Sequence, residues 1–314
     1  MIAILAPGQG SQTPGMLAPW LEESPEGNRA RQTVAAWSEA TGLDLERLGS
    51  TADADEIKDT SVTQPLVVAT SLVAFARLAE RVALPGSAPV AGHSVGELAA
   101  AAVAGVLTPG AAVEFAAVRG REMAAACAVE STGMSAVLGG NPDEVLARLE
   151  ELGLDPANRN GAGQVVAAGP AQALAALAAD PPERARVKSL AVAGAFHTRF
   201  MAPAEEALRA HAGSVTPADP VRPLLSNADG TAVGDGAEAL RRLVAQVTRP
   251  VRWDACMAAL KQMQVSAVIE LPPAGALVGL VKRELKGTAT LPLKTPDDLD
   301  AAAELIAEHA GSAA

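Results

Sequence analysis

The sequence is poor in aromatic residues, in cysteine and in basic residues. Only 2% of its 314 residues are aromatic and tyrosine is absent, so we expect an interior of Ala, Val and Leu and few base-stacking surfaces. Lys and Arg number 25 against 36 Asp and Glu, and the net charge of −11 argues against a nucleic-acid partner. The two cysteines, Cys127 and Cys256, lack metal-ligand spacing, so we expect two buried thiols and no metal site.

Targeting and membrane signals are also missing. The opening residues, MIAILAPGQG, have no basic segment and no small-residue cleavage site, so we expect a first strand and not a signal peptide. The Ala-rich stretch from Leu98 to Leu107 has about half the length of a membrane span. We therefore expect a cytoplasmic protein with no membrane partner.

What is present is typical of a globular α/β protein. Hydrophobic residues make up 49% of the chain and charged residues 19%, and the length suits about two domains or one domain with an insertion. Short apolar runs alternate with Ala- and Leu-rich helical segments, which predicts a parallel sheet covered by helices. Strands are expected at residues 2–6, 88–91, 224–226 and 267–271, and helices up to residue 41 and at 64–82, 96–105 and 237–247.

The pattern changes from about residue 132 onward. Strands are expected at 134–138, 157–160, 164–168 and 187–192, with helices at 142–151 and 171–179. This order, β-α-β-β-α-β, is typical of a ferredoxin-like unit. We therefore predict an α/β-hydrolase-like core with a parallel sheet, formed by residues 1–130 and 197–309. A small ferredoxin-like α+β subdomain at 131–196 is inserted in it, and residues 310–314 form a tail.

One motif carries nucleophile chemistry. Residues 92–96, Gly-His-Ser-Val-Gly, match G-x-S-x-G between an expected strand and an expected helix, which is the context of a nucleophile elbow. The glycines allow the close approach of strand and helix, and the turn presents the Ser94 hydroxyl at the helix N-terminus. Backbone N–H groups there, beginning with Val95, can receive an oxyanion.

A serine needs a base, and the chain has only four histidines. His211 and His309 lie in polar helical stretches and are expected to be solvated surface residues. The ring of His93 is expected to point away from the neighbouring hydroxyl. His197 remains as the candidate base, although its spacing suits a structural histidine equally well, and no Asp stands out as a third triad member.

Two further features accompany the serine. The turn at residues 8–12, Gly-Gln-Gly-Ser-Gln, lacks dinucleotide and P-loop spacing, so Gln9 is a candidate for an oxyanion hole. Arg119 follows the serine by 25 residues, and helical spacing could return it to the same face of the sheet. Taken alone, it would be a surface arginine.

These motifs occur together and in one order. They are Pro7 to Gln12, Thr63-Gln64-Pro65, Gly92 to Glu97, Arg119-Gly120, Asn158 to Gln164, Gly194 to Thr198, and Gln246 followed by Pro250-Val251-Arg252-Trp253. From residue 2 to about 309 the chain resembles malonyl-CoA:acyl-carrier-protein transacylases of bacterial type II fatty-acid synthesis, and looks most like their actinobacterial form. Arg249 and the turn at residues 272–275, Pro-Pro-Ala-Gly, depart from the family pattern.

The resemblance implies a ping-pong enzyme. It would move a malonyl group from malonyl-CoA, through a malonyl-serine ester, to the phosphopantetheine thiol of holo acyl carrier protein, for fatty-acid and also polyketide synthesis. No cofactor is implied, and the family is usually monomeric. The alternatives are a discrete trans-acting acyltransferase of a polyketide synthase, a serine thioesterase or hydrolase, and an inactive carrier-docking module.

The same resemblance implies the roles of individual residues. Ser94 would be the nucleophile and His197 the base, with Gln9 and the Val95 N–H as the oxyanion hole. The backbone of Gln246 would orient the histidine. Substrate contacts would come from Arg119, Gln64, Phe196 and His93.

Two of these roles concern selectivity. Arg119 would pair with the free malonyl carboxylate, because a planar guanidinium binds a carboxylate with two hydrogen bonds. Phe196 matches the malonyl-type signature before the histidine and would leave little room for an α-methyl group, although one methyl group gives only about 1–3 kcal/mol of discrimination.

The acidic net charge requires a local basic patch for an acidic carrier protein. We expect this patch among seven cations that lie near the motifs: Lys188, Arg199, Arg249, Arg252, Lys282, Arg283 and Lys286.

Overall fold

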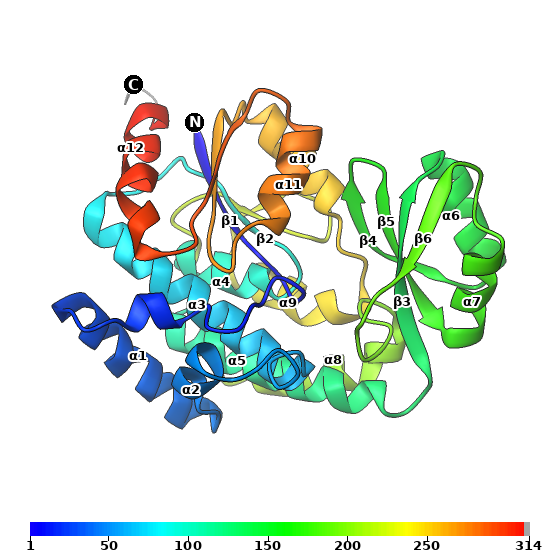
Figure 1. Ribbon diagram of the computed structural model, residues 1–314, viewed down its shortest axis with the longest axis horizontal. Coiled ribbons are helices and arrows are strands. Elements are labelled where there is room, and N and C mark those ends of the chain that lie inside the picture. The colour runs from blue at the N-terminus through cyan, green and yellow to red at the C-terminus, as the bar shows by residue number, and fades with distance from the viewer. Residues whose placement is uncertain (311–314) are drawn as a thin grey trace.

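A computed structural model shows two lobes of unequal size, and it describes residues 1–310 (Figure 1). The predicted tail at 310–314 lies almost wholly outside the described residues. The larger lobe holds a six-stranded sheet in the order β10-β9-β1-β2-β7-β8, and the smaller lobe holds a four-stranded sheet in the order β4-β5-β3-β6. The predicted combination of a parallel α/β core with a ferredoxin-like unit is therefore confirmed.

The strands of the large sheet are parallel, except that β8 runs antiparallel to β7. They are β1 (Ile2–Ala6), β2 (Val90–Gly92), β7 (Leu224–Leu225), β8 (Ala232–Val233), β9 (Ala267–Glu270) and β10 (Ala289–Pro292). All five residues of β1 are buried, as expected for a central strand covered on both faces. In the register of β1 with β2, Ala6 pairs with Gly92, so the loops that follow both strands leave the same edge of the sheet.

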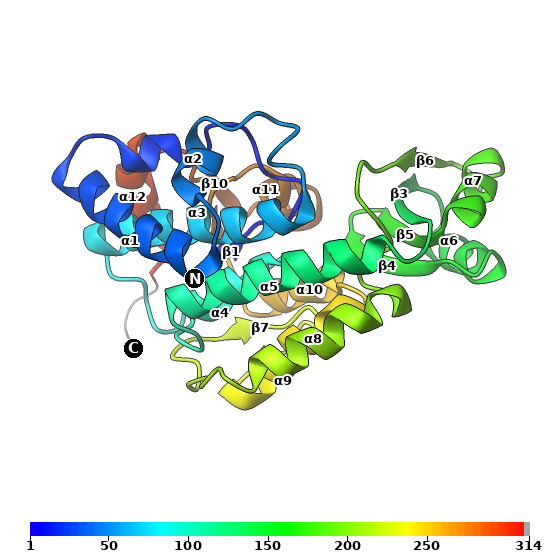
Figure 2. The ribbon, with the colours of Figure 1, turned by 90° about the horizontal axis from the view of Figure 1, so that it is seen from below.

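Helices cover both faces of this sheet (Figure 2). They are α1 (Pro25–Thr41), α2 (Leu45–Ser50), α3 (Thr60–Arg81), α4 (Gly96–Val103), α5 (Pro109–Cys127), α8 (Ala202–Ala212), α9 (Gly236–Ala245), α10 (Trp253–Gln262), α11 (Ala276–Glu284) and α12 (Leu299–His309). Short 3-10 turns are η1 (Ala18–Leu21), η2 (Arg199–Met201), η3 (Gln246–Thr248) and η4 (Pro296–Asp298).

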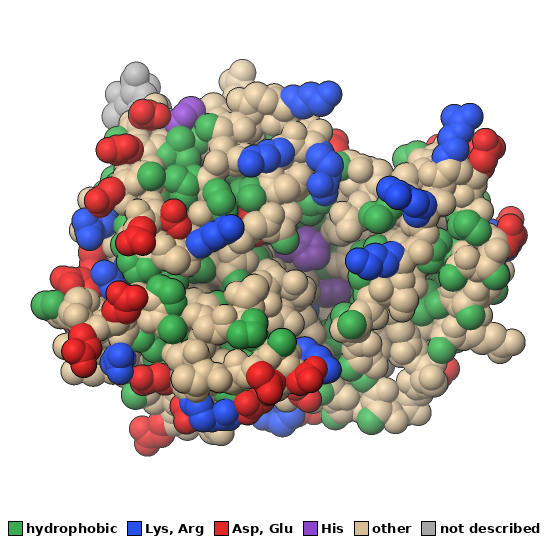
Figure 3. Space-filling model, in the orientation of Figure 1, with side chains coloured by type: hydrophobic (Ala, Val, Ile, Leu, Met, Phe, Trp, Pro, Cys, Tyr) green, Lys and Arg blue, Asp and Glu red, His purple; other side chains and the backbone are tan. Residues whose placement is uncertain are grey.

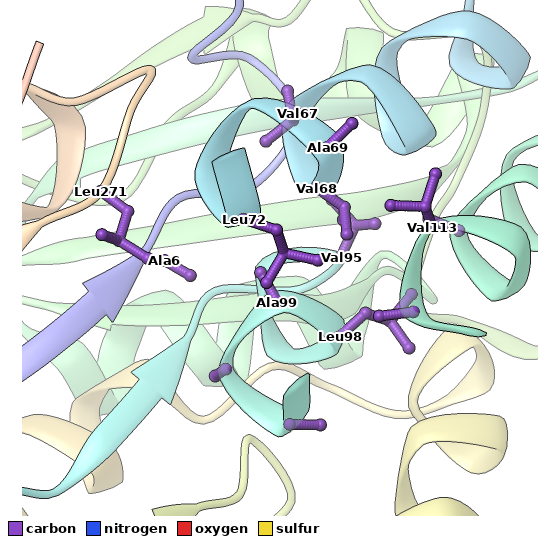
Figure 4. Close-up of a cluster of buried hydrophobic side chains, with 14 of the residues drawn as sticks. Ala6, Val67, Val68, Ala69, Leu72, Val95, Leu98, Ala99, Val113 and Leu271 are labelled. Carbon is purple, nitrogen blue, oxygen red and sulfur yellow. The ribbon is translucent and has the colours of Figure 1, made fainter. Parts of the chain in front are cut away.

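The core of the large lobe consists mostly of aliphatic side chains, with a few buried aromatic ones such as Trp20 and Phe115. Figure 4 shows Val68 and Leu72 of α3 beside Val95, Leu98 and Ala99 around the start of α4. Ala and Val in this layer let the helices come close to the sheet, as the low aromatic content predicts.

The long helix α3 is the one helix among residues 1–310 that is long and apolar enough to cross a membrane, by length and composition only. Its most apolar window is 72% buried inside the protein, which is typical of the core helix of a folded domain.

The small lobe contains β3 (Thr132–Gly139), α6 (Pro142–Glu151), β4 (Asp155–Gly161), β5 (Gln164–Pro170), α7 (Ala171–Ala179) and β6 (Ala185–Ser189). Its strands pair antiparallel, and its two helices lie on the outer face of the sheet (Figure 1). The last strand ends at Ser189, three residues earlier than predicted. A single bridge between Asn158 and Val251 joins the lobes through the backbone.

Candidate active site

The turn after β2 forms the elbow that the motif predicts. Ser94 has a φ of 54°, in the left-handed region that is rare for non-glycine residues. A Cβ on Gly92 would lie 2.1 Å from Gly96 C, and a Cβ on Gly96 would lie 2.3 Å from Ala6 O, so both flanking positions require glycine. The strained turn places Ser94 two residues before the first residue of α4.

His197 lies directly against this serine. Its Nε2 is 2.7 Å from Ser94 Oγ, and its Nδ1 is 2.8 Å from the backbone O of Gln246. Because a carbonyl only accepts, Nδ1 carries the proton and Nε2 is free to accept the serine proton. Burial, and then the charge of Arg119, lower the pKa of His197 to about 3, so the ring is a neutral base at physiological pH.

Arg119 reaches the same point from α5 and is only 2% exposed. Its Nη1 donates to Gln64 Oε1 at 2.6 Å, and its Nη2 donates to Gln246 Oε1 at 2.9 Å and to Ser94 Oγ at 3.3 Å. Burial lowers its pKa to about 9, so it stays cationic at neutral pH. The guanidinium therefore favours negative charge on Ser94 Oγ and on any acyl group bound there.

Two groups in the same network were missed by the sequence analysis. Glu97 was quoted within the motif without a role, and Asn227 was not considered. Asn227 Oδ1 accepts from the Ser94 N–H at 2.8 Å, and its Nδ2 donates to Gly92 O at 2.7 Å. Asn227 follows the short strand β7 and lies 133 residues from the serine in sequence, so no local pattern connects the two.

Glu97 is 4% exposed, and its carboxylate accepts from the Asn227 N–H at 3.1 Å and from Gln246 Nε2. The one signal that the sequence offered is the position of Glu97, an acidic residue directly after the nucleophile motif and at the start of an Ala-rich apolar stretch. Burial raises the pKa of Glu97 to about 7. The Gln246 side chain, for which only a backbone role was expected, connects Glu97 with Arg119.

The candidate oxyanion donors lie beside the elbow. Gly8 approaches His93 so closely that a Cβ there would lie 2.5 Å from His93 O. The Gln9 side chain donates to Thr60 Oγ1 at 3.1 Å. Within residues 1–310, neither the Gln9 N–H nor the Val95 N–H has a hydrogen-bond partner. Both backbone donors are therefore unpaired in this part of the chain, and Val95 is fully buried.

His93 and Phe196 flank the serine and the base in sequence. The Nε2 of His93 lies 2.8 Å from Asn160 Oδ1, and its ring meets the Trp253 ring edge-on at 5.6 Å. It therefore links the elbow to β4 of the small lobe, and burial lowers its pKa. Phe196 is 6% exposed and belongs to the main apolar core.

Three expectations about other side chains are wrong or incomplete. His211 is half-buried against Phe115, with ring centroids 5.4 Å apart, and is not a fully solvated residue. His309 Nδ1 lies 2.8 Å from Ser266 Oγ. Cys256 is buried as expected, but Cys127 is only half-buried.

Among residues 1–310 no group of three His, Cys, Asp or Glu side chains is arranged to hold a metal ion.

A hollow between the lobes exposes histidine side chains, with basic side chains on both sides of it (Figure 3). Lys282, Arg283 and Lys286 are exposed on or just after α11 of the large lobe, and Lys188 is exposed on β6 of the small lobe. Of the other expected cations, Arg199 and Arg252 are paired with Asp155 and Asp254.

Comparison with known proteins identifies relatives over the whole chain. Residues 4–306 match the family described as acyl transferase domain. The malonyl CoA-acyl carrier protein transacylase of Mycobacterium tuberculosis is 57% identical over 306 residues, covering 97% of this chain and 100% of the relative.

Solved structures agree with this result. The crystal structure of MCAT from Mycobacterium tuberculosis has a TM-score of 0.92 at 56% identity and covers 96% of this chain and 99% of its own. A malonyl-transacylase in complex with a type II PKS acyl-carrier protein has a TM-score of 0.87 at 29% identity, with 97% and 99% covered.

Proposed function

We propose, because this chain belongs to the acyl transferase family and within it to the malonyl-CoA–acyl carrier protein transacylases, that it transfers malonyl groups from coenzyme A to a carrier protein. The observation that carries the proposal is the buried Arg119 guanidinium, 3.3 Å from the hydroxyl of a serine that is also hydrogen-bonded to a neutral histidine. A hydrolase of simple esters has no need of a buried cation at that point.

The first half-reaction uses Ser94 and His197. Ser94 Oγ attacks the thioester carbon of malonyl-CoA while His197 Nε2 takes the hydroxyl proton. The Gln9 and Val95 N–H groups receive the developing oxyanion. The carbon–sulfur bond then breaks, and the coenzyme A sulfur leaves with the proton from His197. A malonyl-serine ester remains.

The second half-reaction runs in the opposite sense. The phosphopantetheine thiol of holo acyl carrier protein gives its proton to His197 and attacks the ester carbon. The bond to Ser94 Oγ breaks, and the serine recovers its proton from the histidine. These steps use only side chains and backbone N–H groups of the protein and the two thioesters, so the proposed reaction includes no cofactor.

Arg119 and Gln64 select the acyl group. The guanidinium receives the free carboxylate of malonyl, and Gln64 holds the guanidinium through a 2.6 Å hydrogen bond. Phe196 next to the base limits space beside the α-carbon, and His93 borders the elbow on the side of the small lobe. The Gln246 carbonyl orients His197.

The carrier protein docks at the exposed cations beside the hollow, from Lys188 on one lobe and from Lys282, Arg283 and Lys286 on the other. A polyketide carrier is a second candidate acceptor, because one of the similar solved structures is bound to a type II PKS acyl-carrier protein. We infer a cytoplasmic monomer, as the family resemblance implies.

The intact mass of the protein after brief exposure to malonyl-CoA tests this function. We expect a malonyl adduct on the wild type, none on Ser94→Ala, and its transfer when holo acyl carrier protein is added. Loss of the adduct to free malonate at the same rate with and without carrier would identify a hydrolase instead. No adduct from any acyl-CoA would identify a docking module.

A further inference from the structure

Glu97 occupies an unusual place for a carboxylate. It lies in the first turn of α4, three residues after Ser94, and is 4% exposed. Carboxylates are almost never buried without a partner, because removing the charge from water costs several kcal/mol. None of the steps proposed above uses this residue, although it lies within two hydrogen bonds of Arg119.

Both carboxylate oxygens of Glu97 act as acceptors. Oε1 accepts from the Asn227 N–H at 3.1 Å, and Oε2 accepts from Gln246 Nε2. The amide nitrogen of Gln246 therefore faces Glu97, and its amide oxygen faces Arg119 Nη2 at 2.9 Å. A Gln246 amide turned by 180° would place its NH₂ group against the guanidinium, so the carboxylate selects one of two orientations.

Asn227 extends the influence of Glu97 to the nucleophile. Its backbone N–H is held by Glu97, and its side-chain oxygen accepts from the Ser94 N–H at 2.8 Å. The same oxygen accepts from Gln246 Nε2 at 3.2 Å. The backbone oxygen of Gln246 in turn holds His197. Through these hydrogen bonds, the Glu97 carboxylate is connected to the nucleophile, the base and the cation.

We infer that Glu97 is a positioning residue for malonyl transfer: its ionised carboxylate fixes the Gln246 amide and the Asn227 backbone, and through them Arg119, His197 and Ser94. This inference rests on the proposed function and deepens it. A glutamine at position 97, or a protonated carboxyl, would offer one acceptor and one donor where two acceptors are needed.

Glu97 gains or loses its proton near neutral pH. Burial raises its pKa to about 7, whereas the pKa of His197 is lowered to about 3. The group is faced by Arg119 from α5 and by the Cys256 thiol from α10. Behind it lies a cavity of about 490 Å³, which Arg159 of β4, Arg242 of α9, Arg249 and Arg252 also line. Activity that needs the carboxylate is present above pH 7 and lost below it.

The test measures the rate of malonyl-Ser94 formation from pH 5.5 to 9 without an acceptor, in the wild type, Glu97→Gln and Glu97→Asp. At pH 8 we expect loading by Glu97→Gln to fall by about 10- to 100-fold, and its preference for malonyl-CoA over acetyl-CoA to fall by about tenfold. The inflection near pH 7 disappears in Glu97→Gln and remains in Glu97→Asp, which keeps two acceptor oxygens.

Glu270→Gln is the matched control, since Glu270 is also a buried carboxylate but binds only backbone N–H groups at the start of α11. It should keep the wild-type pH profile and acyl preference. A folded Glu97→Gln with wild-type rate and profile overturns the inference, and so do identical profiles for Glu97→Gln and Glu97→Asp. Failure of the wild type to load malonyl at all would instead overturn the proposed function.

Discussion

Two buried glutamates lie at the same edge of the large sheet, after two different parallel strands, and have different surroundings. Glu270, at the end of β9, accepts from the N–H groups of Gly275, Leu277 and Val278 at 2.9–3.0 Å. Glu97, after β2, accepts from one backbone N–H and from the side chain of Gln246. Burial raises the pKa of both carboxyls.

The difference lies in what each carboxylate holds. The donors around Glu270 belong to the loop before α11 and its first turn, so the charge fixes a helix N-terminus. The donors around Glu97 are linked to the serine, the base and the cation. Two carboxylates that are both buried therefore have different roles: Glu270 stabilises a helix N-terminus, and Glu97 positions the reacting groups. Only their hydrogen-bond partners distinguish the two roles.

The largest effect is expected from removing Arg119, the cation that is linked to Glu97 and has no counterpart among the partners of Glu270. Arg119→Ala is expected to lower malonyl loading by about 100-fold or more, because two charge-assisted hydrogen bonds to the carboxylate are lost. Acetyl loading should fall much less, so that the ratio of the two rates shifts toward acetyl-CoA. The measurement is adduct formation with each acyl-CoA.

Arg121→Ala is the control for that variant, since Arg121 is exposed on the same helix and pairs with Glu122 at 3.0 Å. It should leave both rates unchanged. If Arg119→Ala still loads malonyl in preference to acetyl, the assigned role of Arg119 is wrong.

The pH dependence of stability sharpens the comparison. A carboxyl whose pKa is raised on folding stabilises the protein below its unfolded pKa of about 4.5, and this contribution is lost as the pH rises through about 7. Stability should thus fall over the range in which loading activity rises. We expect the free energy of unfolding of Glu97→Gln, relative to the wild type, to increase by up to about 3 kcal/mol between pH 5 and 8.

Chemical denaturation at several pH values measures this difference. Glu270→Gln should show a pH dependence of the same sign, since burial raises that pKa too, together with a loss of about 1–3 kcal/mol from unmade hydrogen bonds. A relative stability of Glu97→Gln that does not change with pH would mean that Glu97 has an ordinary pKa.

Reversing the charge of exposed side chains should have the smallest effect on the reaction. Reversal of Lys282 and Arg283 to Glu is expected to raise the apparent KM for carrier protein by about 3- to 10-fold at low salt, and less at high salt. Loading from malonyl-CoA without carrier should change little. Reversal of Lys188 and Arg199 tests the other side of the hollow in the same way.

A reversal of Arg209 and Arg241 serves as the control, because these exposed residues lie on α8 and α9, on the face opposite α11 (Figure 2). It changes the net charge equally without touching the hollow. An equal rise of the KM in this variant would show that net charge, and not a docking patch, governs carrier binding.

Much of the fold could be predicted from the sequence alone. The predicted bounds of β1, α6 and α7 agree with the structure. Strand β1 is a short apolar run that ends before Pro7, and each of the two helices starts at or just after a proline. The segments predicted less well depend on distant partners. Strand β6 is mostly exposed and ends early, and β7 has only two residues, so neither has a strong pattern of its own.

In the candidate site, too, the residues in local motifs could be predicted and those that depend on distant partners could not. The residues in local motifs, such as Ser94 between two glycines, could be found because the elbow is a short-range steric solution. Asn227, and the side chain of Gln246, could not, since their partners lie 133 and 149 residues away. His211 was misjudged because its contact with Phe115 comes from a different helix.

The sequence by itself determined the alternation of strands and helices, the inserted ferredoxin-like unit and the strained turn that presents Ser94. These follow from local periodicity and from the need for glycine where backbones touch. Tertiary structure alone decided which hydrogen bonds the buried polar groups make. A buried donor or acceptor takes whatever partner the fold brings within about 3 Å, and that choice depends on residues far apart in the chain.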